Sequence, residues 1–331
     1  MRLFWNDAEG RIRAPWRLLV HATIFLLSTS LFAGIFSMPL TFAGDTEAHF
    51  TITEEGSAIS AGLLLAGTLG ALGGALISTW FAAVYLDRRP FRDLGLRITP
   101  AWWADFVFGL LLGVALIAAS FAVKVGMGWV QIVGWGLAEV GPAIFLAEFV
   151  MITVAFVAVG FWEELVVRGY QMTNLAEALN MRRRTATGAV IAALVLTSLG
   201  FAVLHTTNPG HSTLGLVNIG LISLMVLGLA YAITGRLGLS IGLHVSWNFA
   251  LSFIFGLPVS GVVVGSAPLL IAEDIGPELW TGGPFGQEGG LLGTLAIVTG
   301  CIAVIAWLRF RERGLALSTD LAKPPDAPSP S

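Results

Sequence analysis

Two adjacent carboxylates, Glu163 and Glu164, stand near the end of a long apolar stretch in the middle of the chain. The run before them, from Ala143 to Val159, contains a single charge, Glu148. A charge inside a membrane helix costs about 2.5–3.5 kcal/mol even on insertion scales, so intramembrane acids are candidates for function. A carboxylate can act as a general base toward water, although both acids could also simply cap or solvate a helix end.

The position of the next charge separates the two acids. Glu164 and Arg168 are four residues apart with the acid first, which is the favourable order for an ion pair on a helix. Glu163 points about 100° away, because a helix has about 3.6 residues per turn. We therefore expect Arg168 to neutralise Glu164 as structural support, and Glu163 to face elsewhere as the reactive acid.

Two later segments contain polar groups with the same four-residue spacing. Phe201 and His205 end one apolar run, and His244 and Asn248 lie within another, so each pair shares a helix face. A histidine at a helix end is often only a satisfied polar group, whereas an ionisable group within a span is a functional candidate. With Glu163 as base, His205 could hold the water or pass on a proton. His244 and Asn248 could donate hydrogen bonds to a developing oxyanion.

Three short motifs thus follow one another on successive apolar segments, about 40 residues apart: Glu163-Glu164-x-x-x-Arg168, Phe201-x-x-x-His205 and His244-x-x-x-Asn248. This ordered set resembles the CPBP family. That family includes the type II CAAX prenyl endopeptidases and the bacteriocin-processing and immunity proteins, also called the Abi family. The matched core is Ala143–Phe255, and the layout of the apolar spans extends the likeness.

The resemblance implies an intramembrane endopeptidase that cuts a membrane-embedded or membrane-associated peptide or protein substrate. By the same likeness Glu163 and His205 activate water, and His244 and Asn248 form the oxyanion site. Phe201 then supports the site, together with Glu164 and Arg168. The prenylated substrate belongs to the eukaryotic branch of the family and does not transfer to this chain.

Metal dependence is a separate question, because the family has often been labelled a metalloprotease. Glu163, His205 and His244 could serve as zinc ligands, and three protein ligands plus water make a catalytic zinc pattern. However, the sequence has no His-Glu-x-x-His motif, and using Glu163 as a ligand would remove the obvious base. We therefore expect a metal-free glutamate mechanism that requires no cofactor.

The composition is that of a membrane protein. Apolar residues make up 56% of the 331 residues and charged residues only 12%, whereas soluble domains contain about 25% charged residues. The mean hydropathy is +0.82. The single Cys301 excludes disulfides within the chain, and the net charge of -3 gives no argument for a nucleic-acid partner. We expect an all-α, polytopic membrane protein in the plasma membrane, or inner membrane, if the source is bacterial.

Eight apolar runs are long enough to span a bilayer core of about 30 Å. They are Leu18–Phe42, Ala61–Leu86, Trp103–Gly126, Ala143–Val167, Gly188–Leu204, Leu214–Thr234, Leu239–Phe255 and Leu291–Leu308. With the N-terminus in the cytoplasm, all but one of the 18 Lys and Arg residues fall on the cytoplasmic side, the exception being Lys124. Both termini are therefore predicted to be cytoplasmic.

The spans divide the chain into regions. We expect a cytoplasmic N-terminus at 1–17, three helices with loops at 18–142, and a catalytic core of four consecutive helices at 143–255. An extracytoplasmic loop at 256–290, a last helix at 291–310 and a disordered Pro-rich tail at 311–331 follow. Glu288, at the end of the loop, is interpreted as favourable charge at the start of the last helix.

The depth of the site stays open at this stage. The helical rise places Glu163 and His205 about 30 Å from the basic turn at 182–184, but His244 only about 12 Å from Arg236. The three residues lie at the same depth only if the hairpin around that turn extends into the cytoplasm.

Two other classes of function also remain open. One is a non-catalytic immunity or scaffold protein of the same fold, and the other is a transporter with a proton relay. The complete motif set favours the protease over the scaffold, and the absence of an obvious repeat or broken helix pair disfavours the transporter.

Overall fold

The computed structural model describes residues 3–7, 9–42, 50–53, 56–180, 185–312 and 314–325; at 40–42, 50–53 and 56 only the backbone is described. Within these ranges seven helical segments are long and apolar enough to cross a membrane, and an eighth apolar segment, Gly238–Ile254, is shorter. The seven are Ala14–Pro39, Ala61–Asp87, Pro100–Gly126, Gly136–Leu179, Ala186–Thr207, Thr213–Thr234 and Leu291–Glu312. The chain is thus an all-α integral membrane protein, in which the seventh of the eight predicted spans is shorter than the others.

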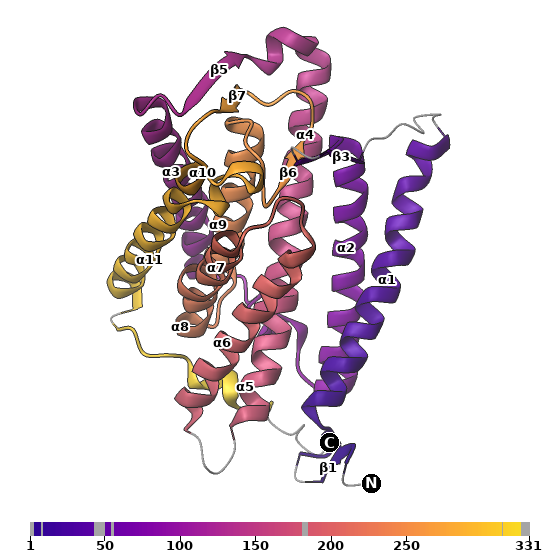
Figure 1. The fold of residues 1–331 in the computed structure, drawn as a ribbon. Coiled ribbons are helices and arrows are strands. Elements are labelled where there is room, and N and C mark those ends of the chain that lie inside the picture. The colour runs from indigo at the N-terminus through magenta and orange to yellow at the C-terminus, as the bar shows by residue number, and fades with distance from the viewer. Residues whose placement is uncertain are drawn as a thin grey trace.

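The first two helices form a pair along one side of the bundle (Figure 1). They are α1 (Ala14–Phe42) and α2 (Ala61–Phe81), and α2 continues as a π-helical turn, Ala82–Asp87. Gly74 of α2 faces Thr29 so closely that an added Cβ would collide with it. Small residues let helix backbones approach closely, which is how two apolar helices associate within lipid.

The helix that carries His244 packs on α3 through glycines contributed by both helices. Gly109 and Gly113 of α3 (Pro100–Gly126) lie against the backbone of α9 (Gly238–Phe249). Gly242 of α9 lies in turn against the carbonyl of Phe106. A Cβ at these positions would push the two helices apart. The position of α9 is therefore set by backbone contact with α3.

The helix that carries the two acids is long and irregular at both ends. α4 (Gly136–Glu164) bends at Gly141, whose φ is 77°, immediately before Pro142. A π-helical segment, Leu165–Met172, follows Glu164 directly and leads into α5 (Thr173–Leu179). π-Helical turns inside α-helices are frequent at functional sites.

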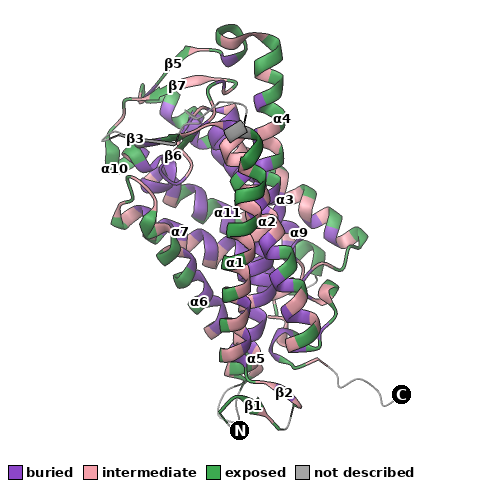
Figure 2. Cartoon of the chain, turned by 90° about the vertical axis from the view of Figure 1, so that its right-hand side faces the viewer, coloured by how far each residue is buried: buried purple, intermediate pink, exposed green. Residues whose placement is uncertain are grey.

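The remaining helices complete the bundle around a buried interior. α6 (Ala186–Leu204) is followed by α7 (Thr213–Ile222), which continues through a π-helical segment, Ser223–Gly228, into α8 (Leu229–Thr234). The last helix is α11 (Leu291–Glu312). Figure 2 shows buried residues on the faces that meet inside the bundle and exposed residues along the outer faces.

Short strands gather at the end of the bundle opposite the termini (Figure 1). β4 (Gly56–Ile59) pairs antiparallel with β3 (Phe50–Thr53) and parallel with β6 (Val262–Val264). A separate antiparallel pair joins β5 (Val130–Gly134) to β7 (Ile271–Asp274), and a short helix, α10 (Glu278–Thr281), follows. The loop 256–290 is therefore ordered as part of a cap on the bundle.

Two buried charges hold this cap to the helices. Glu148 of α4 accepts hydrogen bonds from the backbone amides of Ser266 and Ala267 and from the Ser266 hydroxyl. Lys124 of α3 pairs with Asp274 at 2.7 Å. A buried charge is tolerated when such partners replace its lost hydration. Glu148, the one charge in the apolar run before the motif, thus serves to anchor the loop.

At the other end, the N-terminal hairpin β1 (Trp5–Asn6) and β2 (Arg11–Ile12) lies beside α5. Glu177 of α5 pairs with Arg11 at 2.6 Å and also with Arg89. Arg17 of α1 pairs with the fully buried Asp87 at 2.7 Å. These pairs join α1, α2 and α5 at the end of the bundle that holds both termini.

The segment after α11 differs from the predicted disorder over its described part. Residues 311 and 312 are the last of α11, and the chain then runs back to a short helix, Thr319–Ala322, with Leu321 and Ala322 buried. The amide of Ser318 donates to the carbonyl of Ala232, and the Asn180 side chain donates to the carbonyl of Ala322. These apolar and backbone contacts order the segment before its prolines begin, and residues 326–331 lie outside the described residues.

The three motif residues reach a common level because the α5–α6 hairpin is long. In Figure 1 the described ends of α5 and α6 reach beyond the end of α8 on the side of the termini. The extra length lets Glu163 and His205, far from that end along their helices, reach the same level as His244. The basic turn at 181–184 itself lies outside the described residues.

Candidate active site

The predicted ion pair between Glu164, the last residue of α4, and Arg168 of the following π-helical segment is present, and it is fully enclosed. Arg168 donates to Oε1 of Glu164 at 2.9 Å, and both side chains are buried. The second guanidinium nitrogen donates to the hydroxyl of Ser223 at 2.7 Å. The guanidinium carbon also lies 4.8 Å from the centre of the Phe201 ring, which is within cation–π range. Phe201 thus supports Arg168, which in turn neutralises Glu164.

His244 lies between the two acids. Its Nδ1 is 2.9 Å from Oε1 of Glu164, and its Nε2 is 3.7 Å from Oε2 of Glu163. A carboxylate can only accept, so Nδ1 of His244 donates the hydrogen bond to Glu164. Glu164 therefore holds two groups, Arg168 and His244, whereas the sequence predicted only the first. Glu163 takes no part in the pair with Arg168, and its carboxylate instead meets Nε2 of His244.

His205 directly follows α6 as its C-cap residue and is oriented by that helix. Its Nδ1 lies 2.8 Å from the carbonyl of Phe201, to which it must donate. This bond leaves Nε2 as the nitrogen available to a neighbouring group. The rings of Phe201 and His205 are 4.7 Å apart, and Phe201 also meets His244 edge-on at 6.4 Å. Phe201 therefore contacts both histidines as well as Arg168.

A cavity of about 270 Å³ brings the candidate residues together. Its lining includes Glu163, His205, His244 and Asn248, the four predicted catalytic residues, together with Phe201. Glu164 and Arg168 lie behind this wall, as expected of support residues. Most other lining side chains are apolar, including Ile59, Phe156, Val159, Ile219, Ile222, Val262 and Val264. An apolar pocket with a few convergent polar groups is the usual form of a small binding or active site.

One charged residue of this cavity was misinterpreted from the sequence. Glu288 is buried, and within the described residues its carboxylate bonds to α9 and the cap rather than serving the start of α11. It accepts from Nε1 of Trp247 at 3.0 Å, and from both the amide and the hydroxyl of Ser260 at 2.7 Å. Trp247 lies next to Asn248 on α9, so Glu288 ties the cap to the helix that carries two candidate residues. Its place in a Gly-rich segment gave no sign of this contact.

The alternative zinc site does not fit the geometry. Among the described residues, no three His, Cys, Asp or Glu side chains are grouped closely enough to hold a metal ion. Glu163, His205 and His244 are all described, so they do not form such a group despite sharing one cavity. The metal independence of the reaction stays a prediction.

The comparisons agree with the motifs. Residues 145–250 match the family model described as Rce1-like: Type II CAAX prenyl endopeptidase Rce1-like. This segment holds all three motifs and is similar to that family, so the predicted resemblance is confirmed. No curated protein and no solved structure matches the chain significantly.

Proposed function

We propose that this protein is an intramembrane endopeptidase that hydrolyses peptide bonds with a water molecule activated by Glu163. The single observation that carries the proposal is the shared cavity of Glu163, His205, His244 and Asn248, supplied by three different helices. The family of the matched segment supports the same reaction class.

The separate environments of the two acids support different roles. Oε1 of Glu164 is engaged by Arg168 and His244, so this carboxylate acts as an anchor. The Glu163 side chain is 16% exposed and faces the cavity, so it can accept a proton from water. His205 presents Nε2 as a second acceptor that can orient the water or carry the proton onward. A neutral histidine whose Nδ1 donates to a carbonyl is suited to this task.

The hydrogen-bond donors for the transition state come from α9. The Asn248 amide can donate to the oxygen of the scissile carbonyl as it becomes negative. His244 can do the same through Nε2 when that nitrogen carries a proton, because Nδ1 is engaged by Glu164. Donors already fixed by packing need no rearrangement during the reaction, which is the source of their catalytic effect. The substrate we propose is a peptide segment in or at the membrane.

The test compares membranes that contain the wild-type protein with membranes that contain Glu163→Gln. Glutamine keeps the shape of the side chain but cannot act as a base, so cleavage should fall by roughly 10²–10⁴-fold. Quantitative proteomics of new peptide termini measures this. The matched control is Glu139→Gln, the same change at an exposed position on the same helix.

Folding should survive in Glu163→Gln, because the one ion-pair contact of this carboxylate among the described residues is the His244 ring at 3.7 Å, which is longer than a hydrogen bond. A melting curve in detergent checks this. If the new peptide termini are as abundant with Glu163→Gln as with the control, the proposed role of Glu163 is wrong. If neither the wild type nor the Glu139→Gln control yields new peptide termini, the chain is a non-catalytic member of the fold.

A further inference from the structure

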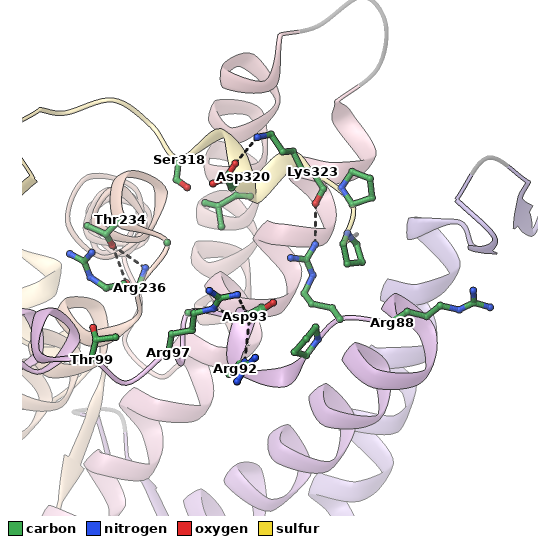
Figure 3. A pocket seen from close by; sticks show the side chains of 17 residues that line it. Arg88, Arg92, Asp93, Arg97, Thr99, Thr234, Arg236, Ser318, Asp320 and Lys323 are labelled. Carbon is green, nitrogen blue, oxygen red and sulfur yellow. Dashed lines mark hydrogen bonds and ion pairs between the residues drawn. The ribbon is translucent and has the colours of Figure 1, made fainter. Parts of the chain in front are cut away.

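A second, larger cavity lies at the end of the bundle that holds both described termini. It measures about 1070 Å³, at the upper end of the range that accommodates drug-sized ligands. Its walls come from the connector 88–99 between α2 and α3, the turn between α8 and α9, and the returned segment 318–325 (Figure 3). None of the candidate active-site residues lines it, so the proposed peptidase does not account for it.

The walls carry six basic side chains and two acidic ones, and most of them are already paired. Arg89 pairs with Glu177, and Arg236 pairs with Asp105 and Glu312. On the returned segment Lys323 pairs with Asp320 at 2.7 Å. The uncompensated charge must therefore lie on the connector.

Of the three other arginines of the connector, Arg92 and Arg97 share a single carboxylate, Asp93. Arg97 lies 2.8 Å from Asp93, whereas Arg92 lies 3.9 Å from it and is 75% exposed. Among the described residues no carboxylate lies within ion-pair distance of Arg88, which extends away from the other two in Figure 3. The connector thus holds an excess of two positive charges, and Arg92 and Arg97 flank the acid on the cavity side.

Two hydroxyl groups and a helix end in the same cavity also favour the binding of an anion. The cavity includes Thr99, whose hydroxyl accepts from the amide of Trp102 and so begins α3, with Pro100 next. The first amides of a long helix carry a partial positive charge, and this end of α3 meets the arginines. Ser318 adds a hydroxyl from the opposite wall.

Exposed aromatic side chains place the cavity at the depth of lipid headgroups. Tyr85 lies one turn before Arg88, and Trp103 lies one turn after Thr99; they are 59% and 53% exposed. Trp80, 48% exposed, contacts Tyr85 edge-on at 5.6 Å. Tyrosine and tryptophan gather where a membrane protein crosses the lipid–water interface. A basic cavity between helices at that depth is suited to the headgroup of an anionic lipid.

We propose that this cavity binds a phosphate-bearing anion, and that the anion is the headgroup of an anionic phospholipid of the surrounding membrane. Arg92 and Arg97 contact the phosphate, and the N-terminal end of α3 adds the partial positive charge of its dipole. A lipid bound there contacts the connector, the α8–α9 turn and the returned segment at once, and so adds to the bonds from Leu237 to Gly95 and from Arg89 to Lys323 that already join them.

The experiment measures binding of phosphatidylglycerol to the purified full-length protein by native mass spectrometry, with zwitterionic phosphatidylcholine as the comparison. The variant is Arg92→Gln/Arg97→Gln. Each arginine near an anionic lipid surface contributes on the order of a fivefold gain in affinity, so the double variant should bind phosphatidylglycerol about 30-fold more weakly. Binding of phosphatidylcholine should not change.

The matched control is Arg309→Gln/Arg311→Gln, which removes the same charge from exposed positions at the C-terminal end of α11, outside the cavity. It should keep the preference for phosphatidylglycerol. Equal losses in both variants, or no preference in the wild type, would overturn the proposal. If the double variant melts at a lower temperature without anionic lipid, the exposed Arg92→Gln alone replaces it, with an expected loss of about fivefold.

A last arm distinguishes the source of the phosphate. Inorganic phosphate is added to the delipidated protein in place of lipid, and its melting temperature is recorded. Stabilisation by phosphatidylglycerol well beyond that by phosphate supports a lipid ligand. Saturation by inorganic phosphate alone, with no added effect of lipid, would show that the cavity serves a soluble anion and that the lipid assignment is wrong.

Discussion

Glu164 shows how one buried carboxylate can stabilise the helix and organise the site at once. Its Oε1 receives a hydrogen bond from Arg168 on its own helix and another from His244 on α9. The first contact follows from helical spacing, and the second from the way α4 packs on α9. Replacing Glu164 should therefore affect stability and the orientation of His244 together, whereas Glu163 makes one longer contact, 3.7 Å to the His244 ring, among the described residues.

A double-mutant cycle on Glu164 and Arg168 should reveal strong coupling. Glu164→Gln or Arg168→Gln alone leaves a buried charge uncompensated, which costs about 3–5 kcal/mol of folding free energy. The double variant leaves neither charge, so its loss should be well below the sum of the two. Unfolding in detergent measures all four proteins.

The control cycle uses Asp93 and Arg97, which have the same i,i+4 spacing but an exposed arginine, 67% accessible. Its coupling should be at most about 0.5 kcal/mol. Equal coupling in the two cycles would contradict the structural role of the enclosed pair. Glu164→Gln should also cleave more slowly per folded molecule, since a neutral amide oxygen is a weaker acceptor for His244 than the carboxylate that orients it.

At the level of elements, the cap of strands and loops is attached to the helices by individual buried charges. Glu148 holds residues 266 and 267, Lys124 holds Asp274, and Glu288 holds Ser260 and Trp247. The third attachment lies in the wall of the candidate active site. The cap and the catalytic helices are thus joined at the cavity itself.

Glu288→Gln should loosen the cap locally. The amide offers one acceptor oxygen where the carboxylate offers two, so either Trp247 or Ser260 is left with a buried unpaired donor, at a cost of about 1–3 kcal/mol. Hydrogen exchange of peptides that contain Ser260 should accelerate, while exchange in α3 stays unchanged. Glu273→Gln, at an exposed position of the same loop, is the control. Identical exchange in the two variants would refute the anchoring role.

For the whole molecule, the arrangement of the two ends agrees with an even number of crossings. β1 and the short helix Thr319–Ala322 lie at one end of the bundle, and the cap lies at the other (Figure 1). The shorter segment Gly238–Ile254 must cross as the seventh span for this to hold. Since nearly all basic residues fall on the side of the termini, that side is proposed to be cytoplasmic.

Cysteine labelling tests this topology. In a Cys301→Ala background, Glu273→Cys in the cap should react with a membrane-impermeant maleimide in intact cells. Arg97→Cys, in the connector, should react only after permeabilisation. Both positions are exposed, so access depends on the side of the membrane alone. Labelling of Arg97→Cys in intact cells would show that the connector is outside the cell and that the proposed orientation is wrong.

The sequence by itself determined the class of protein, the spans and the contacts within one helix. Composition and the length of each apolar run are enough to predict the spans, because a helix must be about 20 residues long to cross the bilayer core. The pairing of Glu164 with Arg168 was predictable for a similar reason, since helical periodicity places residues four apart side by side. The disorder predicted for the tail was wrong over 314–325, because composition does not reveal a complementary surface elsewhere in the fold.

Only the tertiary structure decided how the helices share their polar groups. His244 meets Glu164 from 80 positions away along the chain, and Glu288 reaches Trp247 across 41. Neither contact has a local signature, because it depends on how closely α4, α9 and the cap approach one another. That approach is set by glycines on facing helices and by the buried charges of the cap, whose partners become adjacent only when the chain is packed.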